Sequence, residues 1–147
     1  MSSLLSRSAI DLAALMDSVV DEGQGGLASF LGVVRNHQDG KGVVRLEYVA
    51  YEAMAETEAR RIVAEAESRW PVRVALTHRV GTLAIGEAAI GVVAAGAHRS
   101  EAFDACRYVV EEVKRRVPIW KKETYADGTV AWVDPTARPA VAEVESR

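Results

Sequence analysis

A predicted helix ends and a predicted strand begins within Val113-Lys114-Arg115-Arg116-Val117-Pro118-Ile119-Trp120-Lys121-Lys122-Glu123. Pro118 closes the helix, because proline has no backbone N–H and its ring clashes with the preceding turn. Five of the nine residues from Lys114 to Lys122 carry a positive charge. Such a local concentration of cations indicates a site for an anionic ligand.

The rest of the chain is not basic. Its 18 Lys and Arg residues stand against 21 Asp and Glu residues, which gives a net charge of -3 and a pI near 5.7. A protein that binds nucleic acid along one face is usually more basic than this. We therefore expect a small phosphorylated or carboxylated ligand in a pocket, and neither nucleic acid nor a membrane as a partner.

The length of 147 residues suits one domain, which we place at residues 1–134, followed by a polar and weakly patterned tail at residues 135–147. No apolar run is long enough to cross a bilayer and the start lacks a hydrophobic signal region, so we expect a cytoplasmic protein. The single cysteine, Cys106, excludes an internal disulfide and lies in a helical apolar stripe. No histidine pair has metal-ligand spacing, so we predict no metal site.

Hydrophobic periodicity predicts three helices and the strands of a mixed or antiparallel sheet. The helices are expected at Asp11–Val20, with Ser8 as cap, at Ala53–Arg69 and at Ser100–Arg116. Strands are expected at Leu27–Arg35, Val43–Tyr51, Val72–Val80 and Ala88–Ala97, the last central in the sheet, and a hairpin at Ile119–Tyr125 and Thr129–Val133. We expect the first two strands to pair through the loop between them.

Lys114 lies on the boundary of the apolar stripe of the third helix, which we expect to run through Phe103, Cys106, Val110, Val113 and Val117. Arg107 precedes Lys114 by two turns on the same side, so burial and like charge would lower the pKa of the Lys114 amine. A lysine of this kind acts as a base or a nucleophile. The alternative is a lysine that lays its stem over apolar surface and keeps its charge in water.

Lys121 and Lys122 point to opposite faces of the expected strand, so only one of them can join Lys114. The alternative is an edge strand protected from aggregation by its charges. His98 and Arg99 stand where a strand meets a helix N-terminus, which favours an anion. For His78 and Arg79, inside a strand, we favour packing and a surface charge.

Five segments in the same order resemble the MoaE family, the large catalytic subunits of molybdopterin synthase. They are Phe30–Asn36, Leu46–Ala55, His78–Leu83, Ala97–Phe103 and Lys114–Glu123, within a match that extends from about Gly25 to Pro135. The last segment, KxxxPxWKKE, is the most specific of the five. Two positions depart from the family pattern: Val33 stands where some members have a basic residue, and Gly96 where serine is common.

The resemblance implies an α+β fold with a hammerhead-like part and a homodimer. It also implies two small ubiquitin-like sulfur-carrier subunits, one at each end, which complete a heterotetramer. Each carrier would insert a C-terminal Gly-Gly thiocarboxylate into the active site. The implied reaction is sulfur transfer to cyclic pyranopterin monophosphate (precursor Z), which yields molybdopterin in molybdenum cofactor biosynthesis and needs no resident cofactor.

The same resemblance implies that Lys114 and Lys121 are catalytic. The implied substrate-binding set is Val33, Val34, Arg35, His98, Arg99, Lys114, Lys121, Lys122 and Glu123, with Arg35, His98 and Arg99 on the phosphate. Two other readings remain open: a noncatalytic adaptor whose basic groove receives an acidic tail, and an enzyme that forms a Schiff base through a lysine.

Overall fold

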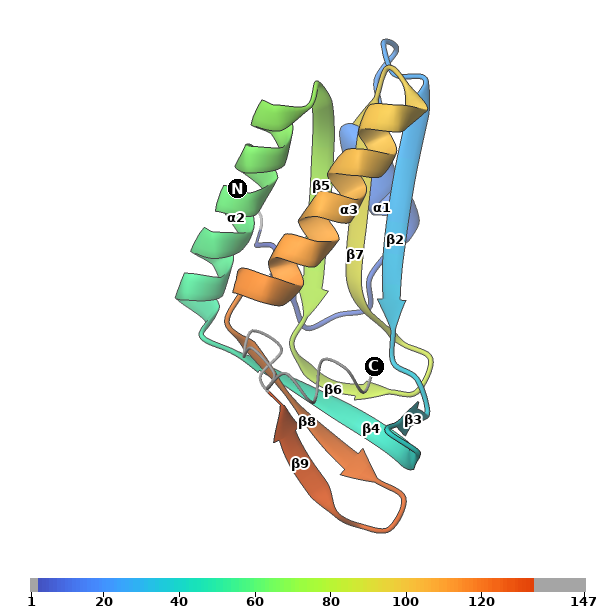
Figure 1. Ribbon diagram of the computed structural model, residues 1–147, viewed down its shortest axis with the longest axis vertical. Coiled ribbons are helices and arrows are strands. Elements are labelled where there is room, and N and C mark those ends of the chain that lie inside the picture. Colours follow the sequence, from blue (N-terminus) through green and yellow to red (C-terminus); the bar gives the residue numbers. More distant parts are fainter. Residues whose placement is uncertain (1–2, 134–147) are drawn as a thin grey trace.

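The computed structural model describes residues 3–133, which form two sheets and three helices (Figure 1). In chain order the elements are β1 (Leu5–Ser6), α1 (Leu12–Val19), β2 (Gly26–Val33), β3 (His37–Gln38), β4 (Lys41–Ala50), α2 (Glu52–Arg69), β5 (Val72–Arg79), β6 (Gly81–Ala84), β7 (Ala88–Gly96), α3 (Arg99–Arg116), β8 (Ile119–Tyr125) and β9 (Val130–Val133). The α+β class is therefore confirmed. The predicted tail at 135–147 lies outside the described residues.

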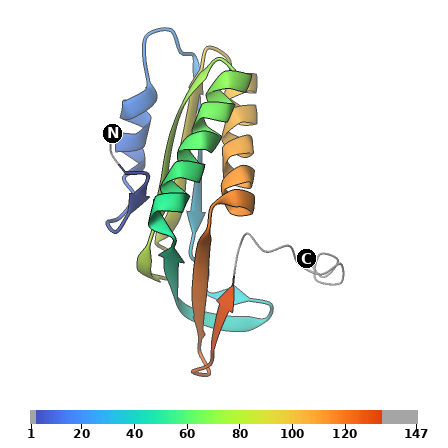
Figure 2. The same cartoon turned by 90° about the vertical axis from the view of Figure 1, so that its left-hand side faces the viewer.

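The first sheet has the strand order β1-β5-β7-β2, with β1 parallel to β5 and the other pairs antiparallel. Helices α2 and α3 cover one face of this sheet and α1 covers the other (Figure 2). Side chains of β7 alternate between the two cores: Val92 and Ala94 pack with α2 and α3, whereas Val93 and Ala95 pack with α1. Strand β7 is thus buried on both faces, and its predicted central position is confirmed.

The second sheet lies beyond the C-terminal end of α3 and has the order β3-β4-β8-β9, with β6 paired to β4 (Figure 1). The expected pairing of the strand ending near Arg35 with the next strand is wrong. Strand β2 pairs with β7 in the first sheet, and β4 pairs with β6 and β8 in the second. The chain changes sheets between Val33 and Lys41, so only the two-residue strand β3 pairs with β4 through the turn.

The three predicted helices are confirmed, each with its N-terminal boundary shifted by one residue. The cap of α1 is Asp11 rather than Ser8, because the Asp11 carboxylate accepts a hydrogen bond of 3.1 Å from the Ala14 backbone N–H. In α3 the predicted stripe is right for Cys106, Val110 and Val113, but Phe103 is 64% exposed. That helix faces both the sheet and α2, so its buried stripe instead includes Ala102, Ala105 and Val109.

In two places on α2 an arginine follows a glutamate by four residues, and one of these two pairs forms an ion pair. Glu56 and Arg60 form it at 3.2 Å. Glu65 does not pair with Arg69: it binds Arg116 of α3 at 2.7 Å instead, while Arg69 lies over an aromatic ring. No helix among residues 3–133 is long and apolar enough to cross a membrane.

Candidate active site

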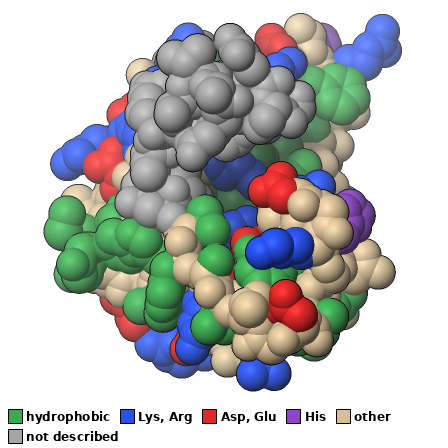
Figure 3. All heavy atoms as spheres, turned by 60° about the horizontal axis from the view of Figure 1, so that its bottom comes forward, with side chains coloured by type: hydrophobic (Ala, Val, Ile, Leu, Met, Phe, Trp, Pro, Cys, Tyr) green, Lys and Arg blue, Asp and Glu red, His purple; other side chains and the backbone are tan. Residues whose placement is uncertain are grey.

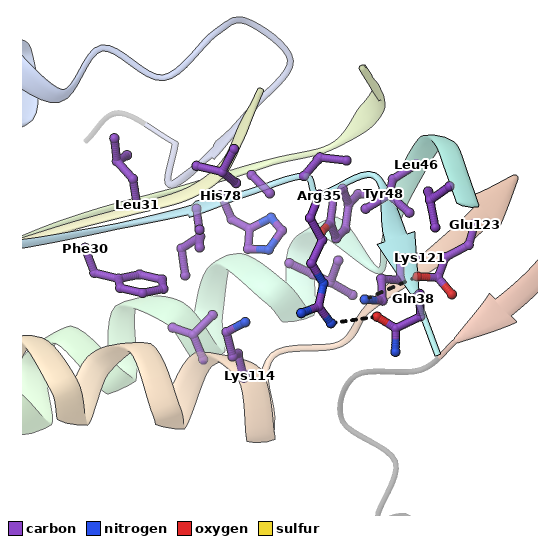
Figure 4. A pocket seen from close by; sticks show the side chains of 18 of the residues that line it. Phe30, Leu31, Arg35, Gln38, Leu46, Tyr48, His78, Lys114, Lys121 and Glu123 are labelled. Carbon is purple, nitrogen blue, oxygen red and sulfur yellow. Dashed lines mark hydrogen bonds and ion pairs between the residues drawn. The ribbon is translucent and has the colours of Figure 1, made fainter. Parts of the chain in front are cut away.

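A cavity of about 430 Å³ lies where the two sheets meet at the C-terminal end of α3 (Figure 4). Its walls come from the end of β2 and the loop after it, from β4, β5, β7 and β8, and from the last turn of α3. Six distant parts of the chain therefore contribute side chains to one site. The polar side chains on its walls are Arg35, His37, Gln38, Tyr48, His78, Lys114, Lys121 and Glu123.

Lys114 enters the cavity from the last turn of α3, where the buried neighbour Val113 anchors the helix against the core. Its pKa lies below the ordinary value for lysine, first because of partial burial and then because Lys121 and Arg35 add positive charge nearby. The predicted neighbour Arg107 has no part in this: its side chain is exposed and pairs with Glu111 at 3.1 Å. The positive charges that lower the pKa of Lys114 therefore come from β8 and from the segment after β2, and not from α3 itself.

Lys121 projects into the cavity from β8, and its Nζ lies 3.8 Å from the carboxylate of Glu123 on the same strand face (Figure 4). Glu123 is only 3% exposed and also accepts a hydrogen bond of 2.8 Å from the Tyr125 hydroxyl. Lys122 points to the other face, where its Nζ lies 5.9 Å from the centre of the Trp132 ring. The prediction that only one lysine of the pair joins Lys114 is confirmed: it is Lys121.

Arg35 reaches the cavity from the segment that follows β2, together with Val34, and Val33 lines it from the last position of that strand. The backbone of Val34 is held on both sides, since its N–H donates to the Glu87 carbonyl at 2.9 Å and its carbonyl accepts from the Gly86 N–H at 2.8 Å. The Arg35 guanidinium donates to the Gln38 side chain at 2.8 Å (Figure 4). These bonds fix a third cation on the cavity wall.

His98 and Arg99 lie outside this cavity, at the opposite end of α3. Lys114 follows Arg99 by 15 residues on that helix, and a rise of 1.5 Å per residue separates their backbones by about 22 Å. Both side chains are exposed. The sequence-predicted site residues thus fall into two groups, and one chain does not bring them together. Lys122 also lies outside the cavity walls.

His78 and Tyr48 line the cavity although neither was among the predicted site residues. Their rings meet edge to face with centroids 5.1 Å apart. Burial raises the pKa of Tyr48 to about 12, with a further contribution from Glu123. The predicted surface charge at Arg79 is wrong, because this side chain is buried and lies 3.6 Å from Glu87. The sequence feature that could have pointed to His78 is its position at the end of a strand in which apolar residues alternate.

The charge around the site stays local. Seen from the end of the molecule that carries the second sheet, Lys and Arg side chains are interspersed with Asp and Glu side chains (Figure 3). Among residues 3–133, three cations, Arg35, Lys114 and Lys121, line the cavity together with one buried carboxylate, Glu123. Within residues 3–133 no three His, Cys, Asp or Glu side chains are grouped so that they could hold a metal ion. The arrangement is suited to a small organic anion.

Comparison with known proteins finds one family model, described as MoaE protein, which matches residues 5–116. The molybdopterin synthase catalytic subunit of rice (Oryza sativa subsp. indica) is 46% identical over 122 residues, which cover 82% of this chain and 63% of the rice protein. The chain therefore spans less than two thirds of that relative's length.

Two of the solved structures that match this chain illustrate the shared fold. The crystal structure of molybdopterin synthase from Staphylococcus aureus has a TM-score of 0.84 and 33% identity, and the match covers 88% of this chain and 95% of that one. A complex of subunits 1 and 2 of the molybdopterin-converting factor from Helicobacter pylori has a TM-score of 0.72 at 23% identity, over 91% of this chain and 90% of that one.

Proposed function

Since this chain belongs to the MoaE family, we propose that it is the catalytic subunit of a molybdopterin synthase, a sulfurtransferase of molybdenum cofactor biosynthesis. The observation that carries the proposal is the meeting of Lys114 and Lys121, from a helix and a strand, in one cavity beside Arg35. Both lysines belong to the segment that most specifically resembles the family. A charged outer surface alone would not require them to share a cavity.

The proposed ligands are cyclic pyranopterin monophosphate and the C-terminal Gly-Gly thiocarboxylate of a small ubiquitin-like carrier. Both are anions, and the three cations of the cavity offer charge-assisted hydrogen bonds to a phosphate and to a chain terminus. A volume of about 430 Å³ lies in the range of pockets that hold small organic ligands. The charge and the size of the cavity therefore both support this pair of ligands.

In the proposed reaction, the carrier sulfur forms a bond to a side-chain carbon of the pterin, a carbon–oxygen bond at that carbon breaks, and the oxygen leaves on the phosphate or as water. Water then attacks the carbonyl carbon of the carrier, the carbon–sulfur bond to the carrier breaks, and the carrier leaves as an ordinary carboxylate while the sulfur stays on the pterin. Two such transfers supply the two sulfurs of the dithiolene.

Lys114 and Lys121 have different parts in this scheme. Because the pKa of Lys114 is lowered, its amine exchanges a proton more readily than an ordinary lysine, which suits it to assist the attack. Lys121, held beside Glu123, stabilises the negative charge that develops on the carrier carbonyl oxygen as the intermediate breaks down.

The proposed assembly is a homodimer that binds two carriers as a heterotetramer. The Helicobacter pylori structure of the same fold holds subunits 1 and 2 of its factor. Because His98 and Arg99 lie about 22 Å from Lys114 along α3, they would contact a phosphate in this cavity only from the second copy. Among residues 3–133 of one chain, Arg35, Lys114 and Lys121 are the cations that line the cavity.

The test is the reaction itself. The purified protein, mixed with thiocarboxylated carrier and cyclic pyranopterin monophosphate, should form molybdopterin, and a carrier that ends in an ordinary carboxylate should not support it. Absence of product in the first mixture would reject the enzyme and favour the noncatalytic adaptor. Borohydride trapping of a covalent adduct between Lys114 and the substrate would favour the Schiff-base enzyme.

The Lys114→Ala variant should lose at least about 100-fold in turnover, the usual size of a lost acid–base group, while it keeps its fold. Lys122→Ala is the matched control, because Lys122 is a neighbouring lysine whose side chain lies outside the cavity walls. Circular dichroism checks the fold of both variants. Equal turnover of Lys114→Ala and the wild type would reject the assigned role.

A further inference from the structure

The helix-facing row of side chains on β5 ends in a histidine. Alternate residues of this strand, Val72, Val74 and Leu76, are buried in the core beneath α2 and α3. His78 continues the row on the same face and lines the cavity together with Lys114. A polar ring thus takes the place of the next apolar side chain at the point where the core opens into the cavity.

One backbone contact fixes which ring nitrogen of His78 carries a proton. The Nδ1 atom lies 2.7 Å from the Arg79 carbonyl oxygen, which can only accept a hydrogen bond, so Nδ1 is the donor. The pKa of His78 is lowered to about 4, first by burial and further by the charge of Lys114, so the ring is neutral near pH 7. Its second nitrogen, Nε2, is therefore an unprotonated acceptor.

The groups around this ring leave its acceptor unused. Tyr48 of β4 contacts the ring edge to face. Lys114 of α3 is close enough for its positive charge to lower the pKa of His78. In the part of the chain that the structure describes, no group donates a hydrogen bond to Nε2. The other acid or amide acceptors in the cavity are engaged: Glu123 binds Tyr125, and Gln38 binds Arg35.

We propose that His78 binds the substrate in this cavity, with Nε2 accepting a hydrogen bond from an N–H or O–H of the heterocyclic part. The cations on the walls bind the phosphate, and the neutral histidine recognises the ring system through this hydrogen bond. Such a division follows from the chemistry, because a phosphate without protons offers Nε2 no hydrogen to accept. This inference rests on the proposed function, which supplies a substrate with both parts.

Two substitutions separate the binding role from the structural one. In His78→Gln the amide oxygen reaches the place of Nε2 and keeps an acceptor there, while the donor to the Arg79 carbonyl is lost. In His78→Asn the amide nitrogen stays near the place of Nδ1 and keeps the donor, while the acceptor toward the cavity is lost. Pterin fluorescence gives the Kd of cyclic pyranopterin monophosphate for each full-length protein, and calorimetry gives the Kd of inorganic phosphate.

Loss of the acceptor should weaken binding of the pterin phosphate about tenfold in His78→Asn, whereas His78→Gln should stay within about threefold of the wild type. Binding of inorganic phosphate should be the same in all three proteins. Should His78→Asn fail to fold, His78→Leu takes its place as the variant without an acceptor, because leucine suits the apolar row and has no hydrogen-bonding group.

Equal Kd values for the pterin phosphate in His78→Asn and the wild type would overturn the inference. Equal weakening in His78→Gln and His78→Asn, with matching losses of Tm, would overturn it as well, because the ring would then serve only to hold the strand end. Both outcomes leave the proposed function standing. Failure of the wild type to bind the pterin phosphate and to make molybdopterin would reject the function and the inference together.

Discussion

Arg116, at the end of α3, is the cation on which the junction between the two long helices depends. Its guanidinium donates to Glu65 of α2 at 2.7 Å, to Glu58 of α2 at 2.9 Å and to Glu112 of its own helix at 3.1 Å. Replacement by alanine removes these bonds and leaves three carboxylates close together. We predict that Arg116→Ala is the most costly single change among the charged residues of α3.

The size of the loss follows from the exposure of the site. Arg116 is 23% exposed, so its bonds are partly screened by water, and the loss lies below the ~3–5 kcal/mol known for broken buried ion pairs. Hydrogen bonds to charged groups contribute ~1.5–3 kcal/mol each when well protected. We expect the free energy of unfolding to fall by about 2–3 kcal/mol at pH 7, and Tm by about 5–10 °C for a chain of this length.

The loss should depend on pH. Hydrogen bonds from Arg116 lower the pKa of Glu65 to about 2 from an ordinary value of 4.5. The stability from this group is present in full above about pH 4.5 and is lost as the pH falls toward 2. In Arg116→Ala the carboxylates repel one another near neutral pH and are relieved by protonation. The difference between the two proteins is therefore greatest at pH 7 and narrows below about pH 5.

Urea denaturation followed by circular dichroism at pH 7 and at pH 3.5 measures both effects. Arg115→Ala is the control, because Arg115 precedes Arg116 directly, is 55% exposed and pairs only with Glu112 among residues 3–133, so its loss should stay below about 0.5 kcal/mol. Equal losses in the two variants, or a loss in Arg116→Ala that does not shrink in acid, would refute the reasoning.

Two further predictions concern the core. Ile62 of α2 is 0% exposed, so Ile62→Ala should lower the free energy of unfolding by about 2–5 kcal/mol in the same urea assay, and a loss under 1 kcal/mol would contradict its place in the core. Burial raises the pKa of the Cys106 thiol to about 11, so the folded protein should react with Ellman's reagent at pH 8 only slowly and should react at once in urea. Rapid reaction of the folded protein would show that the thiol is accessible.

The elements of the fold were predictable because each depends on near neighbours in the chain. The apolar residues of α2 recur at helical spacing, and Pro71 and Pro118 lie just beyond the ends of α2 and α3. The choice of Lys121 over Lys122 is equally local, since adjacent residues of a strand must face opposite ways. Strands β1, β3 and β6 were missed because two to four residues are too few to show a period.

The candidate site was predictable only in part, from the residues to which the family resemblance gives a role. The resemblance gave Arg35, Lys114 and Lys121 as a group, and they do line one cavity. The source of the extra charge on Lys114 could not be read from helical spacing, because Lys121 and Arg35 reach it from β8 and from the segment after β2. The sequence favoured a packed strand residue at His78. Its place on the cavity wall depends on the second sheet, whose strands β4 and β8 form other walls of the cavity.

From the sequence alone came the helices, the main strands and the direction of each lysine from its own backbone. These follow from sterics and side-chain alternation, which act over a few residues. Only the tertiary structure decided that β2 joins β7 rather than β4, that Arg116 clamps two helices, that His78 opens into the cavity and that His98 and Arg99 stand far from it. Such contacts join residues distant in the chain, and their free energy depends on how whole elements pack, which no local pattern encodes.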